Sequence, residues 1–366
     1  MPSLTTPADK TALAAFFSLL IFLTADFTAG RIFTHVLQQQ KLERDRIQTD
    51  FAAIKDESIP YHHDFKPNQD MAMTWAFYIY RLKTNSLGFR DARVRDVSLT
   101  PAKQRILLLG DSFTEGAGYD FEKTFAGLLQ KDLEKDGIEV LNGGVTLYSP
   151  LIYYKKTQYL LESKGLKFDE LVVFLDAGDI ADEAHGFYED EAGRVRKRPE
   201  AEDQQDRHWS VVLNQFLKDN SILGRTLAAI HRSFTMQEKS FKRRSALWTV
   251  KKELYEEFGR QGLQRAEEHM NALQALLQKH GIKLTIAVYP WPDHIFYQDR
   301  DSIQVRFWKN WAETHQASFM NFFPDFINGR PYRQVLWDYF IPGDVHWNEK
   351  GHKLIAESFL KQWRHE

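Results

Sequence analysis

Apolar and polar positions follow two rhythms from about residue 86 to the end of the chain. Apolar runs of strand length occupy 105–109, 138–141, 171–175, 284–289 and 317–322, and segments with helical periodicity lie at about 122–135, 150–164, 263–280 and 351–363. Short, continuously apolar strands are typical of a parallel sheet that is covered on both faces. Their alternation with helices therefore predicts an α/β domain over 86–366.

A long apolar segment, 11–33, lies near the start of the chain and contains only two charges, Asp26 and Arg31. At 1.5 Å per residue, this segment just crosses a hydrocarbon layer of ~30 Å. A buried core helix and a cleaved signal peptide are the alternatives. The preceding tail, 1–10, offers only Lys10 as a cation, and no clear small-residue cleavage site follows the segment. We therefore favour an uncleaved transmembrane anchor.

The charges around this segment do not decide its orientation. One cation precedes it and three cations lie within 41–46, a distribution that slightly opposes an exported C-terminal domain. We expect Asp26, near the end of the span, to reach the membrane interface. Residues 34–85 are interpreted as a stalk and lead-in, helical and polar to residue 56 and irregular from 57 to 85.

A charged segment interrupts the alternation of strands and helices. Between 186 and 207, 12 of 22 residues are charged, which predicts a solvated loop or a mobile insertion. Residues 208–262 have a helical pattern and lie between two strands of the sheet. We therefore expect an insertion at about 184–262 that emerges near a sheet edge and could cap a cleft.

Composition excludes several kinds of chemistry. The chain has 366 residues, with 48 Lys and Arg against 50 Asp and Glu, so its charge gives no reason to expect nucleic acid as a partner. Cysteine is absent, which excludes disulfides, Cys-ligated zinc, iron–sulfur clusters and thiol nucleophiles. Phosphate-binding and dinucleotide-binding glycine patterns are also absent, so we expect no cofactor. No metal site is predicted.

A serine stands where an α/β sheet usually presents its ligand site. Gly110, Asp111 and Ser112 directly follow the apolar run 105–109 and precede a helical segment. A serine at such a turn is exposed, and nearby backbone N–H groups can face a developing negative charge. The same three residue types are also ordinary turn residues, so the tripeptide alone is weak evidence for a catalytic serine.

One histidine has the surroundings of a catalytic base. Asp344 precedes His346 by two residues, and Asn348 and a C-terminal amphipathic helix follow. In a turn, this spacing lets the carboxylate bind one ring nitrogen while the other faces outward, which fixes the tautomer and stabilises the imidazolium. An ordinary helix start capped by Asn348 explains the same residues, and both interpretations can hold together.

These residues resemble the SGNH (GDSL) hydrolases, whose signatures occur here in the same order. They are 106–116 with Ser112, 140–145, 171–179, and 344–348 with Gly351, and the segment 85–91 is similar to a lead-in of some envelope members. The resemblance implies a flavodoxin-like three-layer α/β/α sandwich with a parallel central sheet. It also implies Ser112 as nucleophile, His346 as general base and then acid, and Asp344 as its orienting partner.

The last signature departs from the usual family pattern. The family usually has Asp-x-x-His, whereas this chain has Asp344-Val345-His346 with Gly343 at the usual Asp position. The Asp-x-His-Trp form resembles the branch that includes alginate O-acetylation proteins, which move or remove acetyl groups on envelope polysaccharides.

The middle signatures also differ at the positions that the family uses to bind the oxyanion. Gly144 belongs to the second signature, and Leu147 stands where the family usually offers a glycine N–H. Gly178 stands where the family usually has an Asn whose amide completes the oxyanion hole. Losing one such donor typically costs ~10²–10³ in rate. Asp179 and its acidic neighbours are interpreted as loop-capping carboxylates, with a hard-cation site as the alternative.

Trp291 follows the fourth apolar run, again at the carboxyl end of a predicted strand. It lies between two prolines in the sequence Tyr-Pro-Trp-Pro. An aromatic ring at this edge could stack on a sugar face, and a rigid loop with Trp291 packed into the core is an equally good interpretation.

Together these observations predict a membrane-anchored serine ester hydrolase or O-acyl (acetyl) transferase that forms an acyl-enzyme on Ser112. The branch resemblance implies an acetylated envelope polysaccharide as substrate, a membrane acyltransferase as a candidate partner, and a periplasmic or otherwise extracytoplasmic domain behind a single-pass anchor. Two alternatives remain: a lipid or small-ester esterase, and a degenerate domain that serves as a binding or assembly module.

Overall fold

Five apolar segments form a parallel sheet in the computed structural model, which describes residues 7–56, 58–76, 78–199, 217, 220–227 and 243–364. The strands are β5 (Gln104–Leu109), β6 (Ile138–Asn142), β7 (Glu170–Leu175), β10 (Lys283–Val288) and β11 (Ser318–Asn321). Their order in the sheet is β11-β10-β7-β5-β6. All five confirm the strands predicted from the sequence. β7 is buried along its whole length, as expected for a strand covered on both faces.

The first two crossovers leave the centre of the sheet in opposite directions. The connection through α3 (Phe125–Leu133) leads from β5 to β6 on one side, and the connection through α4 (Pro150–Gln158) leads from β6 back past β5 to β7. Because such crossovers are right-handed, α3 and α4 lie on opposite faces. The carboxyl ends of β5 and β7 therefore form the topological switch point of the sheet, where ligands bind in open α/β folds.

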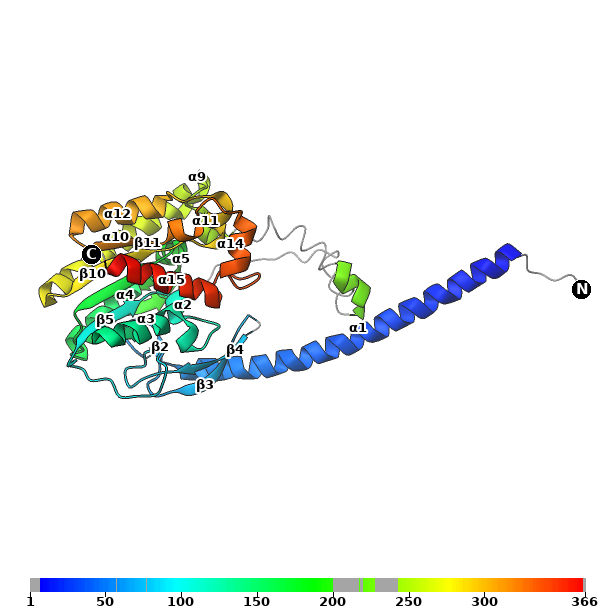
Figure 1. Ribbon diagram of the computed structural model, residues 1–366, viewed down its shortest axis with the longest axis horizontal. Coiled ribbons are helices and arrows are strands. Elements are labelled where there is room, and N and C mark those ends of the chain that lie inside the picture. Colours follow the sequence, from blue (N-terminus) through cyan, green and yellow to red (C-terminus); the bar gives the residue numbers. More distant parts are fainter. Residues whose placement is uncertain are drawn as a thin grey trace, which may run out of the picture. The chain divides into compact units, whose positions relative to one another are not determined.

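Further helices complete both outer layers (Figure 1). On the α3 face, the ring of Phe174 in β7 lies 4.7 Å from Phe125 of α3 and 6.3 Å from Phe359 of α15 (Glu349–Trp363). On the other face, α10 (Arg260–His280) packs against α4, and α12 (Ile303–His315) packs against β10 and β11. The predicted three-layer α/β/α sandwich is confirmed.

Shorter elements connect these layers. They are α2 (Ser112–Glu115), α5 (Ala177–Ala181), α8 (Arg244–Leu247), α9 (Lys252–Leu254), α11 (Pro292–Tyr297), α13 (Phe323–Phe326) and α14 (Tyr332–Tyr339), together with a short pairing of β1 (Lys55–Asp56) and β2 (Asp64–Phe65). α4 continues into a π-helical turn, Tyr159–Ser163.

A β-hairpin occupies part of the segment that was expected to be irregular. β3 (Asp70–Trp75) pairs antiparallel with β4 (Tyr78–Lys83), from Asp70 opposite Lys83 to Trp75 opposite Tyr78. Met73, Tyr80 and Leu82 are buried, whereas Ile79 and Arg81 on β4 point to solvent. The prediction was wrong here because aromatic and apolar residues on both faces of the hairpin mask the two-residue alternation of a half-buried strand.

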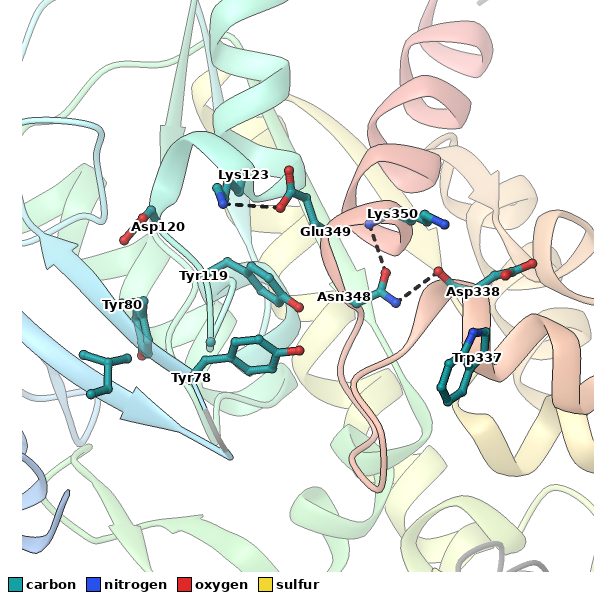
Figure 2. A pocket seen from close by; sticks show the side chains of 12 residues that line it. Tyr78, Tyr80, Tyr119, Asp120, Lys123, Trp337, Asp338, Asn348, Glu349 and Lys350 are labelled. Atoms are coloured by element: carbon teal, nitrogen blue, oxygen red, sulfur yellow. Dashed lines mark hydrogen bonds and ion pairs between the residues drawn. The ribbon is translucent and has the colours of Figure 1, made fainter. Parts of the chain in front are cut away.

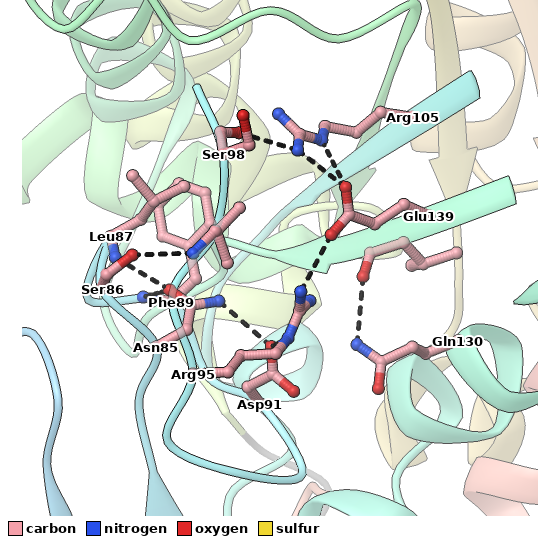
Figure 3. A network of polar contacts seen from close by, with 12 residues as sticks. Asn85, Ser86, Leu87, Phe89, Asp91, Arg95, Ser98, Arg105, Gln130 and Glu139 are labelled. Carbon is pink, nitrogen blue, oxygen red and sulfur yellow. Dashed lines mark hydrogen bonds and ion pairs between the residues drawn. The ribbon is translucent and has the colours of Figure 1, made fainter. Parts of the chain in front are cut away.

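A polar network ties the segment after this hairpin to the amino end of the sheet (Figure 3). Arg95 donates to Asp91 at 2.8 Å and to Glu139 at 3.0 Å. Arg105 on β5 donates to the other oxygen of Glu139 at 2.8 Å, and Asn85 donates to Asp91 at 3.2 Å. The lead-in expected from the sequence is thereby fixed against β5 and β6 before the chain enters the sheet.

The N-terminal helix α1 (Pro7–Ile54) contains the predicted anchor and continues through the predicted helical stalk. The segment Lys10–Gln39 is long and apolar enough to cross a membrane, and its most apolar 18-residue window is not buried, whereas the core helix of a soluble protein is mostly buried. A signal sequence meets the same criteria of length and composition. The single apolar span is therefore confirmed as a helix, and its orientation stays a prediction.

Residues 1–46 and 200–240 form one structural unit, and residues 47–199 and 241–366 form the other. Within the first unit, Asp26 accepts hydrogen bonds from the Ser221 hydroxyl at 2.5 Å and from the Leu223 N–H at 2.8 Å. A Cβ on Gly30 would lie 2.3 Å from the carbonyl oxygen of Asn220, so the two segments approach closely. Asp26 thus caps a helical segment at 222–227, and its expected position at a membrane interface stays a prediction.

The charged insertion begins with a second hairpin, β8 (Phe187–Glu189) paired antiparallel with β9 (Val195–Lys197). The expectation of a loop was wrong for this part, because Phe187 and Val195 are buried and anchor the strands, while the charged residues face solvent. Most of 200–242 lies outside the described residues, so the helical cap that we expected there stays a prediction.

Candidate active site

The structure brings together the three residues predicted to form the triad, although 234 positions separate Ser112 from His346. The Ser112 hydroxyl oxygen lies 2.7 Å from Nε2 of His346, and Nδ1 of His346 lies 2.5 Å from Oδ1 of Asp344. Ser112 is 8 % exposed and His346 is 6 % exposed. A serine hydroxyl, an imidazole and a carboxylate are therefore in hydrogen-bond contact, the arrangement that a nucleophile and its base require, at the edge of the sheet where ligands bind in open α/β folds.

The turn after β5 positions the nucleophile. Asp111 caps α2 by accepting a hydrogen bond from the Phe113 N–H at 2.9 Å. A Cβ on Gly110 would lie 2.1 Å from the hydroxyl of Thr114, so the tight passage from strand to helix requires glycine there. Buried Arg90, from the lead-in, donates to backbone carbonyls just after α2, including that of Gly116 at 2.6 Å. The predicted lead-in thus holds the nucleophile loop in place.

The Asp-x-His spacing works as a local turn. Oδ1 of Asp344 accepts hydrogen bonds from both Nδ1 and the backbone N–H of His346, the latter at 3.0 Å. Gly343, at the usual Asp position, has a φ of 78°, which suits a glycine turn that brings the following residue into the carboxylate's role. The shortened motif therefore preserves the carboxylate–imidazole contact.

Asp344 is held in its charged form. Burial alone would raise the pKa of Asp344, but hydrogen bonds from His346 outweigh it and lower the pKa to about 2. Since this value lies below that of an unfolded Asp, the charged carboxylate contributes stability above about pH 4, which is lost as the pH falls through about 2. The orienting charge is thus present throughout the neutral range.

Trp75 is a site residue that the sequence did not reveal. Its indole Nε1 donates to Oδ2 of Asp344 at 3.2 Å, and its ring meets that of His346 edge-on, with centroids 4.7 Å apart. Trp75 ends β3, in the segment that we had interpreted as irregular. The Asp344 carboxylate is therefore held from two sides, by His346 on one oxygen and by Trp75 on the other.

Replacing Trp75 with phenylalanine is expected to lower kcat for aryl acetate hydrolysis by roughly 10-fold. A hydrogen bond to a charged group is worth about 1.5–3 kcal/mol, and its loss frees Asp344 to turn away from His346. KM should stay within about 2-fold, because Trp75 acts through Asp344. The matched control is Arg81→Gln on the neighbouring strand, where an exposed ion pair contributes little. Equal losses in both variants would assign the effect to hairpin stability.

A buried cluster of carboxyl groups lies beneath the nucleophile. The Tyr289 hydroxyl is 3.1 Å from Oδ1 of Asp111 and 3.1 Å from Oδ2 of Asp176. Burial, and then the charge of Asp176, raise the pKa of Asp111 and that of Asp179 well above their usual value. Burial raises the pKa of Asp176 as well, but hydrogen bonds from Trp291 and from backbone N–H groups favour its charged form, so we infer that the negative charge of the cluster resides there. A neutral Asp111, 3.4 Å from the Ser112 hydroxyl, places no second charge beside the nucleophile.

The second signature forms the loop that can face the oxyanion. The N–H of Gly144 donates to Oδ1 of Asn142 at 3.0 Å, so this glycine is engaged inside the loop. Leu147, by contrast, has a φ of 71°, and its N–H and that of Ser112 have no hydrogen-bond acceptor among the described residues. These two N–H groups are therefore available as candidate oxyanion donors.

Buried side chains fix this loop. Glu115 accepts from the Thr146 N–H at 2.8 Å and from its hydroxyl at 2.6 Å. His63 lies 2.8 Å from the carbonyl oxygen of Thr146, and the buried ammonium of Lys156 donates to the carbonyl of Gly143 at 2.7 Å. Such anchoring keeps Leu147 in a backbone conformation that costs a non-glycine residue about 1–2 kcal/mol.

Replacing Leu147 with glycine is expected to raise the free energy of unfolding by about 0.5–1 kcal/mol and to leave kcat within about 3-fold. Glycine removes the strain at positive φ and keeps the N–H, while greater freedom of the unfolded chain offsets part of the gain. The control is Gln316→Gly, which has a φ of 56° at the end of α12. Chemical denaturation measures the stability of both variants, and steady-state kinetics measure their kcat. A loss of kcat confined to Leu147→Gly would show that the Leu147 side chain contributes to catalysis.

Trp291 occupies the space above Gly178. Its indole Nε1 donates to Oδ2 of Asp176 at 2.7 Å, and a Cβ on Gly178 would lie 2.9 Å from its ring. An asparagine at 178 would therefore collide with Trp291, which gives a physical reason for the glycine. Because the Trp291 N–H is bound to Asp176, it does not replace the missing amide donor. The ring is half-buried, so it is neither packed fully into the core nor fully exposed for stacking on a sugar.

The other acidic residues of this region act as helix caps. Asp179 and Asp176 form a reciprocal cap at the start of α5. Glu183 accepts from the Ser149 hydroxyl at 2.8 Å and from the Leu151 N–H at 2.7 Å, at the start of α4. In the part of the chain that the structure describes, no group of three or more His, Asp or Glu residues is arranged to hold a metal ion.

Comparisons with known proteins give similarity of fold. No family model and no curated protein matches the chain, whereas 55 chains of solved structures do. The psychrotrophic esterase EstA from Pseudoalteromonas sp. is 14 % identical, with 72 % of this chain and 100 % of that chain covered and a TM-score of 0.41. TesA is 11 % identical, with 71 % and 98 % covered and a TM-score of 0.41.

An acetyl-xylooligosaccharide esterase, Axe2 from Geobacillus Stearmophilus, is also similar. It is 13 % identical, with 72 % of this chain and 96 % of that chain covered and a TM-score of 0.38. At these identities and scores the comparisons say nothing about chemistry, which rests on the residues of this chain. Those residues agree with the resemblance to SGNH hydrolases in three respects: the parallel sheet, the order of the signatures along the chain, and the contact of Ser112, His346 and Asp344.

Proposed function

We propose that the protein is an SGNH-type serine hydrolase or acyltransferase that cleaves an ester through an acyl-enzyme on Ser112. The observation that carries this proposal is the continuous hydrogen-bonded line from Ser112 through His346 to Asp344. These three residues come from two distant parts of the chain. A plain turn and a plain helix cap do not require their side chains to meet.

The geometry supports a two-step reaction. His346 Nε2 takes the proton of the Ser112 hydroxyl as its oxygen attacks the ester carbonyl, and the N–H groups of Ser112 and Leu147 stabilise the oxyanion. The intermediate collapses, His346 returns the proton to the leaving alcohol, and the acyl group remains on Ser112. Water, or a second hydroxyl group, then attacks the acyl-enzyme with His346 again as base and releases the acid or a new ester.

The missing amide donor at Gly178 predicts a slow enzyme. One absent oxyanion donor costs about 10²–10³ in rate, and the triad itself is intact. A degenerate binding module would not need the buried network that charges Asp344 and fixes the loop of Leu147. We therefore favour catalysis over a purely structural domain.

The substrate that we propose is an O-acetylated glycan of the cell envelope. Two features support it: the Asp-x-His-Trp form of the last signature, and a half-buried Trp291 whose ring lies 6.2 Å from that of Phe113, the residue after Ser112. An aryl acetate, an acetylated neutral oligosaccharide and a long-chain aryl ester test this choice. We expect measurable turnover of both acetates, and a preference for the long-chain ester would favour the lipid esterase instead.

We also propose that α1 anchors the protein in a membrane, with the catalytic domain on the extracytoplasmic side and a membrane acyltransferase as a candidate source of acyl groups. The expected result is that the protein stays with the membrane pellet after alkaline carbonate extraction. A reporter fused after Glu366 should be active only outside the cytosol. Release into the supernatant would contradict the anchor, and a reporter active only in the cytosol would contradict the export.

A further inference from the structure

A cavity lies beside the segment that follows His346, and neither the triad residues nor the loop of Leu147 line it (Figure 2). It encloses about 390 Å³ between the β3–β4 hairpin, the segment before α3, and the loop from α14 to α15. Tyr78 and Tyr119 line one side, and Trp337 from α14 lines the other. We call it the Trp337 pocket.

The aromatic side chains of the pocket are arranged for a ligand. Trp337 is 79 % exposed. Its indole makes no ring contact or hydrogen bond with any other residue that the structure describes. The rings of Tyr78 and Tyr119 lie 5.2 Å apart, tilted by 37°, and in Figure 2 their hydroxyl groups point toward the side occupied by Trp337 and Asn348. An indole so exposed contributes little to folding, and it offers a flat apolar face to a ligand.

Two residues on the wall of the pocket lie next to the triad residues or to Trp75. Asn348, on its wall, follows His346 by two residues and caps α15. Gly118, also on its wall, packs against the side chain of Trp75, which binds Asp344. A chain-like substrate with its ester at Ser112 can therefore extend along the catalytic loop into the pocket.

The charges of the pocket are mixed and largely paired, with Asp338 bound to Arg330, and they do not favour a strongly charged ligand. Three carboxylates, Asp120, Asp338 and Glu349, line it together with the ammonium groups of Lys123 and Lys350. Lys123 and Glu349 pair at 3.4 Å. A phosphate or a uronate chain would meet a set of carboxylates, and an acyl chain would strip water from charged groups. Mixed polar groups around aromatic rings suit hydroxyl groups on an apolar ring instead.

We propose that the Trp337 pocket is a subsite for a neutral sugar residue of the ester-bearing chain, with Trp337 as its stacking platform. This inference rests on the proposed function for its substrate and makes that substrate more specific, because it names an uncharged glycan. Sugar binding in the pocket itself does not require Ser112 to react.

The test uses the 366-residue chain and three variants: Trp337→Ala, Tyr188→Ala as a control for an exposed aromatic outside the pocket, and Ser112→Ala. Acetylated and unacetylated xylo-, manno- and gluco-oligosaccharides serve as probes, with p-nitrophenyl acetate as the small ester. We expect Trp337→Ala to lower kcat/KM for the best acetylated oligosaccharide by about 10-fold, with less than 2-fold change on p-nitrophenyl acetate. Tyr188→Ala should match wild type on both.

Calorimetry on Ser112→Ala separates this inference from the proposed function. The double variant Ser112→Ala/Trp337→Ala should bind the same oligosaccharide about 10-fold more weakly than Ser112→Ala. If that difference is found although the wild type cleaves no ester, the subsite stands and the proposed function fails. If the wild type cleaves esters but no oligosaccharide depends on Trp337 in turnover or binding, the subsite is overturned and the proposed function stands. Tighter binding of an oligouronate than of every neutral probe would also overturn it.

Discussion

Replacing Ser112 with alanine is expected to lower kcat for aryl acetate hydrolysis by about 10⁴-fold or more. In the proposed mechanism the hydroxyl oxygen forms the acyl-enzyme, and no other group within hydrogen-bond distance of His346 Nε2 among the described residues could replace it. Loss of a serine nucleophile removes nearly the whole contribution of a triad, since its members act as one unit. Steady-state kinetics with the aryl acetate measure the effect.

Ser163→Ala, at an exposed serine at the end of the π-helical turn after α4, is the matched control and should leave kcat unchanged. Wild-type levels of residual activity in Ser112→Ala would contradict a mechanism through this serine. Because the Ser112 hydroxyl is a small group with one strong contact, the folded state should survive the substitution, and an unchanged thermal midpoint would verify this.

Replacing Asp344 with asparagine is the second large effect, and we expect kcat to fall by about 10⁴-fold. The amide is uncharged, and it can turn its NH₂ toward Nδ1 of His346, which stabilises the tautomer that cannot accept a proton from Ser112. Trp75 keeps an acceptor in the amide oxygen, so the site should remain folded. The expected loss of kcat therefore reports on the negative charge of Asp344 and on the hydrogen bond that its Oδ1 accepts from Nδ1 of His346.

Asp301→Asn, at an exposed carboxylate whose side chain is 79 % accessible, controls for the change of net charge and should behave as wild type. The measurement is the pH dependence of kcat for both variants. A loss of less than about 10-fold in Asp344→Asn across the neutral range would mean that another group orients His346.

The central sheet was predictable because its signal is local. A strand buried on both faces must be continuously apolar, and the five runs that form the sheet stand between helical segments in the sequence. The hairpin of Met73 and Tyr80 was missed because its outward face also carries apolar residues such as Ile79, so the two-residue alternation is weak. The second hairpin was missed because each of its strands has one buried apolar residue, Phe187 in β8 and Val195 in β9, within a highly charged segment.

The triad was predictable from the chemical types of Ser112, Asp344 and His346 and from the resemblance of their surroundings. Trp75 was not, because its role depends on a contact across 269 positions that no spacing expresses. The engagement of the Gly144 N–H by Asn142 and the positive φ of Leu147 are properties of the folded loop. Only a residue that is unusual for its position, leucine where the family usually has glycine, signalled that the loop matters.

Gly178 illustrates how a packing constraint can resemble a loss of function. From the sequence alone, glycine in place of asparagine signals a missing donor. In the structure, Trp291 covers that position and binds Asp176, so the glycine and the tryptophan form one arrangement. Glycine at 178 is therefore explained by the space that Trp291 occupies, and the missing amide donor is a consequence of this packing.

The most direct test of the central claim is covalent labelling of the whole protein with a fluorophosphonate. Ser112 should displace fluoride and form a stable phosphonate ester, and peptide mass spectrometry should locate the adduct on the peptide that contains Ser112. We expect strong labelling of wild type, none of Ser112→Ala, and much slower labelling of Asp344→Asn. An unlabelled wild type that is folded, or an adduct on any other serine, would contradict the proposed acyl-enzyme.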